Sequence, residues 1–154
     1  MNYFDTSYLV PLVIGELYSS EVATFLATLD RRTLATSHWT LVEFASTLAR
    51  GVRMGRFSRV EADRLQAEFD RIVQGSFSLL LHTEEDYAIA AAFLARGESL
   101  RAPDAMHLAI AGNHTATAIL SLDKKMIVEG RLLRLPISTG IPLPGYPEVA
   151  TPYA

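Results

Sequence analysis

The amino-acid sequence predicts an α/β fold: a three-layer α/β/α arrangement around a central, mostly parallel five-stranded sheet. Short apolar runs alternate along the chain with longer segments of helical periodicity, and no two-residue hairpin turn joins one apolar run to the next. Strands that alternate with helices pair in parallel through right-handed crossovers. No internal repeat and no linker interrupts this alternation.

The five predicted strands are short apolar segments bounded by polar residues, prolines or glycines. In order, they cover residues 1–4, 33–36, 79–81, 118–120 and 132–135. The first stops at Asp5, and the fourth is followed closely by Asp123. Ligands of open parallel sheets bind outside the carboxyl ends of the strands, so both acids fall where functional groups are expected.

Seven segments carry apolar side chains at helical spacing and are the predicted helices. In order, they cover residues 8–13, 21–29, 37–51, 59–73, 84–96, 103–111 and 124–129. Their starts carry recognisable signals: Ser58 and Glu61 fit a capping box, Thr83 precedes a first turn rich in acids, and Pro103 suits a first helical turn. Glycines follow several of their ends.

One domain is expected over residues 1–136, because 154 residues are enough to bury a sizeable core. After Pro136 come four more prolines without periodicity, so residues 137–154 are expected to form an extended or mobile tail. The longest apolar run is far shorter than the roughly 20 residues of a membrane span. We therefore expect no role at a membrane.

The chain has no cysteine, which excludes disulfides and thiolate metal sites and leaves oxygen and imidazole as metal ligands. A cysteine-free chain that begins without a signal-like segment suits the cytoplasm, where we expect this protein. Its formal net charge of −3 excludes nucleic-acid binding by bulk electrostatics, so any contact must be local. Four arginines form a candidate patch but equally suit a solvated helix end. They are Arg50, Arg53, Arg56 and Arg59.

Four acids are notable for the element ends and surroundings in which they fall. Asp5 and Asp123 follow predicted strands. Asp104 lies in the first turn of its helix, and Glu43 lies inside a largely apolar one. Taken singly, the three aspartates have an ordinary explanation as helix caps or partners of the helix dipole. A half-buried glutamate, in contrast, requires a partner.

Taken together, the four acids predict a metal site. They are dozens of residues apart in most cases, yet the topology allows them to converge at one edge of the sheet. Carboxylates at close range repel one another and are hard to keep ionised unless a cation lies between them. Mg²⁺ and Mn²⁺ are hard divalent cations that prefer such oxygen ligands. A carboxylate cage of this kind suits phosphodiester hydrolysis by a metal-activated water.

Four pieces of the sequence, in this order, resemble the PIN domain and, within it, the VapC-type toxin ribonucleases. They are residues 4–10 (FDTSYLV), Glu43 in the third long helix, residues 100–109 (LRAPDAMHLA) and residues 120–123 (LSLD). The resemblance covers residues 1 to about 136 and implies a PIN-like fold. It also implies the toxin of a type II toxin–antitoxin pair, which a cognate antitoxin holds inactive.

The resemblance further implies a metal-dependent endoribonuclease that leaves 5′-phosphate and 3′-hydroxyl ends. Its acidic quartet would be Asp5, Glu43, Asp104 and Asp123. The three aspartates are the expected ligands of Mg²⁺ or Mn²⁺, and the glutamate is expected to act through a bridging water. Hydroxyl and basic side chains nearby are the expected substrate contacts. They are Thr6, Ser7, Ser121, Lys124 and Lys125.

Other readings of the same residues stay open. The chain could be a non-catalytic module whose acidic pocket clasps an arginine of a partner protein, with residues 8–13 and 22–29 offering an apolar face to that partner. A phosphate-handling receiver or phosphatase is less favoured, because no second acid lies beside Asp5. His107 is expected to pack or hydrogen-bond rather than to act as an acid or base. The expected partners are RNA, an antitoxin and a second copy of the chain.

Overall fold

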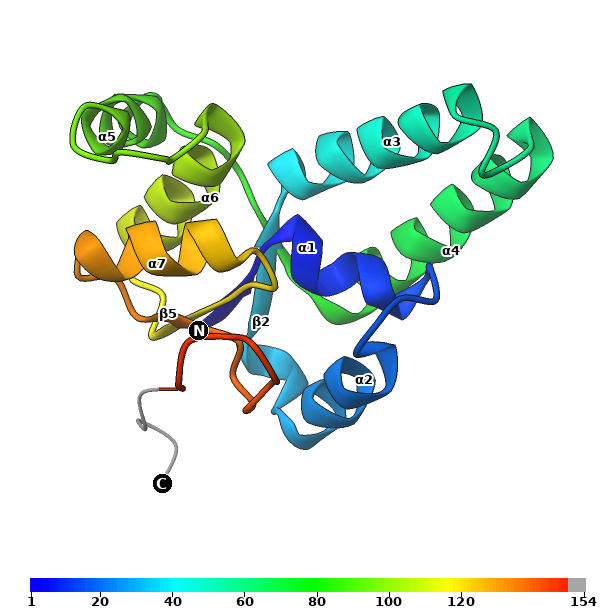
Figure 1. The fold of residues 1–154 in the computed structure, drawn as a ribbon, viewed down its shortest axis with the longest axis horizontal. Coiled ribbons are helices and arrows are strands. Elements are labelled where there is room, and N and C mark those ends of the chain that lie inside the picture. The colour runs from blue at the N-terminus through cyan, green and yellow to red at the C-terminus, as the bar shows by residue number, and fades with distance from the viewer. Residues whose placement is uncertain (150–154) are drawn as a thin grey trace.

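A computed structural model describes residues 1–149 as a single parallel sheet covered by helices on both faces (Figure 1). The strand order is β3-β2-β1-β4-β5, and every neighbouring pair is parallel. The α/β/α class with five strands is therefore confirmed. None of the helices in this part of the chain combines the length and apolar character of a membrane span.

The strands are short, as the sequence predicts. They are β1 (Asn2–Phe4), β2 (Leu34–Ser37), β3 (Ser78–Leu80), β4 (Ala118–Leu120) and β5 (Ile137–Ser138). The helices that follow Ser58 and Thr83 begin at their predicted caps. The helices are α1 (Thr6–Leu9), α2 (Ser19–Thr28), α3 (His38–Arg53), α4 (Arg59–Ser76), α5 (Glu84–Leu94), α6 (Ala102–Asn113) and α7 (Lys124–Leu132), with short 3₁₀ turns η1 (Val10–Leu12) and η2 (Arg31–Thr33).

The position predicted for the last strand, residues 132–135, is wrong. Helix α7 continues to Leu132, and the chain then reverses at Arg134, whose φ of 61° lies in the left-handed region. Leu133 and Leu135 pack against the core without joining the sheet, and Ile137 pairs with Ile119 instead. The sheet thus takes in the first two residues of the expected tail.

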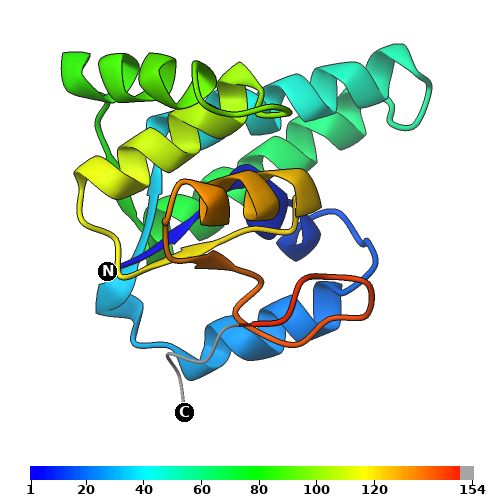
Figure 2. The same ribbon diagram turned by 60° about the vertical axis from the view of Figure 1, so that its left-hand side comes forward.

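The expected division of the chain at residue 136 stays a prediction. Residues 139–149 form no helix or strand, but they lie against α2 rather than apart from the molecule (Figure 2). Residues 150–154 of the expected tail lie outside the described residues.

Two apolar cores lie on opposite faces of the sheet, because successive strand residues point in opposite directions. Phe4 and Leu120 face the core beneath α1 to α4, while Tyr3 and Ile119 face the core beneath α5 to α7. In the first core, Tyr8, Leu9 and Val22 are fully buried. The expectation that residues 8–13 and 22–29 offer an apolar face to a partner is therefore wrong, since that face is used inside the fold.

The strand order reverses beside β1, and this reversal positions the site. From β1 the chain adds β2 and β3 on one side, whereas β4 and β5 lie on the other. Asp5 follows β1, and its backbone N–H donates to Leu120 O of β4 at 3.1 Å. Asp123 follows β4 at the same edge. The fold therefore brings both aspartates to the edge at which open parallel sheets bind ligands.

Candidate functional site

One pocket of ≈610 Å³ at the carboxyl edge of the sheet is lined by all four predicted acids. Asp5 comes from the end of β1, Glu43 from α3, Asp104 from the first turn of α6 and Asp123 from the start of α7. These four elements are distant in sequence, and the parallel topology alone brings their ends together. The predicted convergence of the acids in one hollow is therefore present in the structure.

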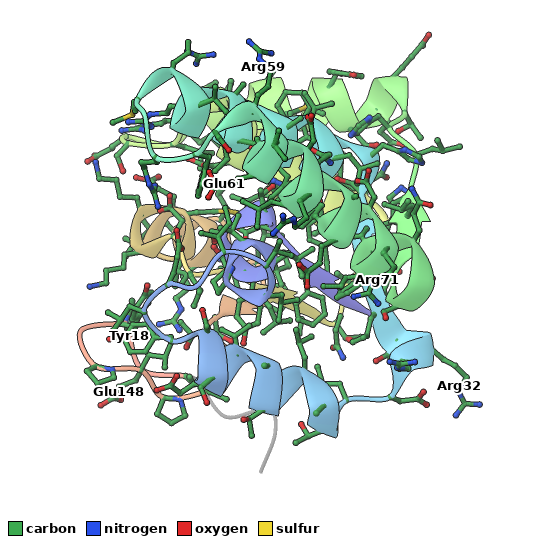
Figure 3. The ribbon with its side chains drawn as sticks, turned by 90° about the vertical axis from the view of Figure 1, so that its right-hand side faces the viewer. Tyr18, Arg32, Arg59, Glu61, Arg71 and Glu148 are labelled. Carbon is green, nitrogen blue, oxygen red and sulfur yellow. The ribbon has the colours of Figure 1, made fainter. Side chains whose placement is uncertain are left out.

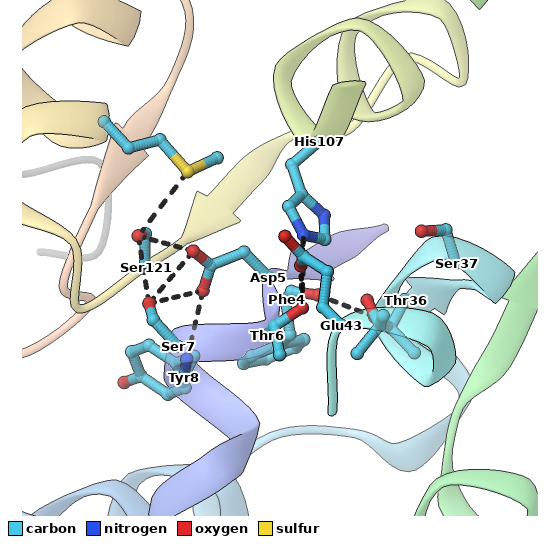
Figure 4. A network of polar contacts seen from close by, with 12 residues as sticks. Phe4, Asp5, Thr6, Ser7, Tyr8, Thr36, Ser37, Glu43, His107 and Ser121 are labelled. Atoms are coloured by element: carbon cyan, nitrogen blue, oxygen red, sulfur yellow. Dashed lines mark hydrogen bonds and ion pairs between the residues drawn. The ribbon is translucent and has the colours of Figure 1, made fainter. Parts of the chain in front are cut away.

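Asp5 lies at the floor of the pocket within a set of hydroxyl donors (Figure 4). The Ser7 Oγ lies 2.8 and 2.9 Å from its two carboxylate oxygens, and Ser121 Oγ donates to Oδ2 at 2.8 Å. The Tyr8 N–H donates to Oδ1 at 3.0 Å, which makes Asp5 the cap of α1 as well. The side chain is only 3% exposed, so its orientation is fixed by these contacts.

Burial raises the pKa of Asp5 to about 6, although His107 and the hydroxyl donors act to lower it. Between about pH 4 and pH 6 the folded protein therefore holds a proton that the unfolded chain has released. The folded state is favoured at the acid end of this window and loses that advantage as the pH rises through 6. Above pH 6, metal-free Asp5 is an ionised carboxylate in a buried position.

This titration predicts a pH-dependent effect of Asp5→Asn on stability. The rise of the pKa from its ordinary 3.8 to about 6 corresponds to roughly 2 to 3 kcal/mol of unfolding free energy. The Asp5→Asn variant lacks this titrating group. Its unfolding free energy relative to that of wild type should therefore rise by this amount as the pH is raised from 4 to 7. Urea unfolding in chelator at both pH values measures it. A difference between variant and wild type that does not change with pH would contradict the burial argument.

Glu43 is held by a chain of polar groups from four other elements, β1, α1, β2 and α6. His107 of α6 lies with Nε2 2.6 Å from Glu43 Oε2, and Thr6 Oγ1 donates to the same oxygen. On the other side of the ring, His107 Nδ1 lies 2.8 Å from the hydroxyl of Tyr3, which in turn lies 2.9 Å from Ser37 Oγ. In this chain the Tyr3 hydroxyl donates to Ser37 Oγ and accepts from the His107 ring.

The same contacts set the charge of Glu43. Burial acts to raise its pKa, but the hydrogen bond and positive charge of His107, together with Thr6, outweigh burial and hold the pKa below its usual range. His107 is buried, whereas the Glu43 side chain is 23% exposed to the pocket, so solvent screens this pair only in part. The partner that sequence reasoning required for a half-buried glutamate is therefore His107.

Asp104 and Asp123 face each other's charge at the mouth of the pocket. Burial, and after it the charge of Asp123, raises the pKa of Asp104. Asp123 also caps α7, because its Oδ1 accepts from the N–H groups of Lys125 at 2.8 Å and Met126 at 3.0 Å. Asp123 is therefore both a helix cap and a pocket acid, because only one of its carboxylate oxygens accepts the hydrogen bonds of the cap.

The donor set suits Mg²⁺ or Mn²⁺ chemically. It consists of carboxylate oxygens of like charge, and the raised pKa of Asp104 reflects burial and the charge of Asp123, both of which a bound cation would offset. Within residues 1–149, no three acidic or histidine side chains are arranged so that they could hold an ion as they stand. Their oxygens instead contact hydroxyls, His107 and the cap of α7.

The predicted substrate contacts fall into three groups. Thr6 and Ser7 line the acidic pocket, whereas Ser121 is fully buried and supports Asp5. Lys124 and Lys125 line an adjoining pocket that also contains Arg101, Asp104 and Asp123. Of the four arginines in the candidate patch, one lines the acidic pocket. It is Arg50.

Sequence reasoning missed several residues that line the pocket, among them Trp39, Val42 and Arg101. For His107 the available signal was its spacing of three residues from Asp104, which puts both side chains on one helix face. The expectation that His107 packs or hydrogen-bonds is confirmed by its contacts with Glu43 and Tyr3. Trp39 and Val42 carried no such signal, because they fit the apolar pattern of α3 equally well.

Comparison with known proteins places this geometry among PIN domains. The model of the PIN domain family matches residues 3–129. The crystal structure of FitAcB from Neisseria gonorrhoeae has a TM-score of 0.73 at 16% identity and covers 91% of this chain and 98% of its own. FitAB bound to an IR36 DNA fragment has a TM-score of 0.72 at 16% identity, with 95% and 100% covered.

A third solved structure comes from Mycobacterium tuberculosis. It is VapC20, described as a sarcin–ricin loop cleaving toxin, with a TM-score of 0.66 at 17% identity and 84% of this chain and 95% of that chain covered. At these identities the likeness concerns the fold. No curated protein matches the sequence significantly.

Proposed function

Because the chain belongs to the PIN domain family, we propose that it is a metal-dependent endoribonuclease and the toxin of a type II toxin–antitoxin pair. The observation that carries the proposal is the convergence of Asp5, Glu43, Asp104 and Asp123 on one pocket from four separate elements. Four carboxylates around one hollow form an oxygen-rich site of like charge, which suits a divalent cation.

In this proposal the three aspartates hold Mg²⁺ or Mn²⁺. When bound, the cation activates a water for attack on phosphorus and offsets the charge on the leaving oxygen. Ser7 and Ser121 keep the Asp5 carboxylate directed into the pocket through their hydroxyl contacts. Glu43, fixed by His107 and Thr6, orients the attacking water as a hydrogen-bond acceptor.

Basic side chains at the pocket rim complete the proposed substrate site. Arg101 lines both the acidic pocket and the adjoining one, where Lys124 and Lys125 are also found. Such cations suit contact with the phosphates on either side of the scissile bond, while the overall acidic chain limits nonspecific binding. We further propose that the protein acts as a homodimer in the cytoplasm and is restrained there by an antitoxin.

Mapping of RNA 5′ ends after brief expression of wild type and Asp5→Asn tests this proposal. Wild type should create discrete new ends that carry 5′-phosphate, and the variant should create none, because the buried ligand is lost. Purified wild type should cleave the same sites only when Mg²⁺ or Mn²⁺ is added. New ends that persist at equal level in Asp5→Asn would contradict the proposal.

The alternative, a non-catalytic module whose acidic pocket clasps an arginine of a partner protein, predicts a different outcome. Wild type would then produce no new RNA ends with either metal. It would still bind an arginine-bearing partner, and Asp5→Asn would weaken that binding.

A further inference from the structure

The segment that follows β5 is a fixed part of the molecule, which we call the C-terminal strap (residues 139–149). The Tyr8 hydroxyl donates to Thr139 O at 2.8 Å, and Arg131 Nη2 donates to Glu148 O at 2.6 Å. Gly140 adopts a φ of +73°, and a Cβ there would come within 2.7 Å of Phe25. The strap is therefore anchored at both ends and packed closely at its start.

The strap carries Tyr146 to the rim of the acidic pocket. Its hydroxyl donates to Leu122 O at 2.9 Å, directly before Asp123. The Lys124 Nζ lies 4.7 Å from the centre of the Tyr146 ring, within the range of a cation–π contact. The ring is half-buried, so part of it stays accessible.

Tyr18, the residue directly before α2, supports Tyr146. The two rings meet edge to face, with centroids 6.0 Å apart, and the Tyr18 hydroxyl donates to Pro144 O of the strap at 3.2 Å. Figure 3 shows Tyr18 at the same corner of the molecule as Glu148. Tyr18 adopts a φ of 71°, a left-handed conformation that is rare for a residue with a side chain. The backbone thus holds a strained residue to complete this aromatic corner (Tyr18 and Tyr146).

Two smaller pockets adjoin the acidic pocket, and Tyr146 lines both. The first contains Lys124 and Lys125 and shares Asp104 and Asp123 with the acidic pocket. The second contains Tyr18 and shares Ser7 with it. An aromatic ring, basic side chains and the acidic pocket therefore follow one another along one surface.

We propose that Tyr146 is a base-stacking residue, on which a nucleotide next to the scissile phosphate of a single-stranded RNA packs while Lys124 and Lys125 contact its phosphates. This inference rests on the proposed function for the identity of the substrate. Aromatic side chains stack on unpaired bases with little sequence preference, and neighbouring lysines supply the backbone contacts. Bases inside a duplex are already stacked, so the site selects loops and single strands.

The charge of the surface favours RNA over a protein partner here. A protein helix that docks in a groove brings apolar anchors, whereas the pocket that Tyr146 shares with Asp123 holds three cations, Arg101, Lys124 and Lys125, and one aliphatic side chain, Leu122. The arrangement matches a strand that alternates bases and phosphates.

Binding of a single-stranded oligo(A) dodecamer with one 2-aminopurine to full-length protein in an Asp5→Asn background tests the inference. Anisotropy gives the affinity, and quenching of 2-aminopurine reports stacking. Adding Tyr146→Ala should weaken binding about tenfold and remove the quenching. Adding Tyr146→Phe, which keeps the ring, should leave both within about twofold. Tyr87→Ala, at a tyrosine 59% exposed on α5, is the matched control and should change neither.

Three outcomes would overturn the stacking role. The Asp5→Asn background could fail to bind the dodecamer, or Tyr146→Ala could bind it as tightly as the background. Alternatively, Tyr146→Phe could lose as much affinity as Tyr146→Ala, which would assign the effect to the hydroxyl that anchors the strap to Leu122. Tyr146→Leu, which keeps apolar bulk, should bind weakly without quenching, and thermal melts check that each variant is folded.

Failure of this inference is distinguishable from failure of the proposed function, because binding is measured without cleavage. Cleavage by wild type together with Tyr146-independent binding would leave the nuclease and remove the stacking site. Tyr146-dependent binding without cleavage by wild type would leave the stacking site and remove the nuclease.

Discussion

An Asp104→Asn variant is expected to lose RNA cleavage by at least about 100-fold and yet to melt at a higher temperature than wild type when divalent metal is removed. The two effects have one cause. Burial and the charge of Asp123 raise the pKa of Asp104, so its ionised form is disfavoured in the empty pocket. Removal of the charge relieves the repulsion but also removes a proposed ligand.

The size of the stabilisation is modest because Asp104 is only partly buried and solvent screens part of its charge. We expect a rise of roughly 2–4 °C in chelator, which corresponds to about 1 kcal/mol for a domain of this size. Added Mn²⁺ should raise the melting temperature of wild type and close this gap. Asp63→Asn, at an exposed acid on α4, is the control and should alter neither melting nor cleavage.

Thermal melts with and without metal, followed by cleavage assays on the same preparations, measure both effects. A variant less stable than wild type in chelator would contradict the clustering of charge. Cleavage within about threefold of wild type would contradict the role of Asp104 as a ligand.

A His107→Leu variant is expected to lose about 3 kcal/mol of unfolding free energy and about 10- to 100-fold in cleavage rate. The imidazole is the buried partner of Glu43, at 2.6 Å, and it also meets the hydroxyl of Tyr3. Without it, the half-buried Glu43 carboxylate keeps only Thr6 as a donor, and the buried Tyr3 hydroxyl keeps only Ser37. His107 positions Glu43 and needs no contact with substrate for this effect.

A second substitution separates this account from general damage to the core. Adding Glu43→Gln to His107→Leu should recover about 1–2 kcal/mol, because it removes the charge that had lost its partner. It should recover no cleavage, since the proposed water-orienting carboxylate is gone. Urea unfolding of the four proteins in this cycle measures the coupling. Additive effects of the two substitutions would mean that the pair is not coupled.

Much of the fold follows from local signals that tertiary packing did not override. The capping boxes at Ser58 and Thr83 begin α4 and α5 as predicted, and the apolar runs of β1 and β4 enter the sheet at their predicted positions. The last strand could not be located, because residues 132–135 are as apolar as β5. Only the extension of α7 and the turn at Arg134 decide which segment pairs with β4.

Some features of the site could likewise be predicted from the sequence, whereas others depend on tertiary packing. Convergence of the acids could be predicted, because parallel strands place their carboxyl ends at one edge whatever the details of packing. The contact between His107 and Glu43 could not, since it depends on how α6 is rotated against α3. The position of Tyr146 depends on the path of a segment without periodicity, held by hydrogen bonds to carbonyl groups that any residue type supplies.

Calorimetric titration of Mn²⁺ into wild type and into the Asp5→Asn, Asp104→Asn and Asp123→Asn variants at pH 7.5 tests the shared cation site most directly. At this pH Asp5, with a pKa of about 6, is ionised. We predict saturable binding to wild type, an affinity at least about tenfold weaker in each of the three variants, and no change in Asp63→Asn. Equal Mn²⁺ affinity in wild type and all three variants would show that these carboxylates do not share an ion.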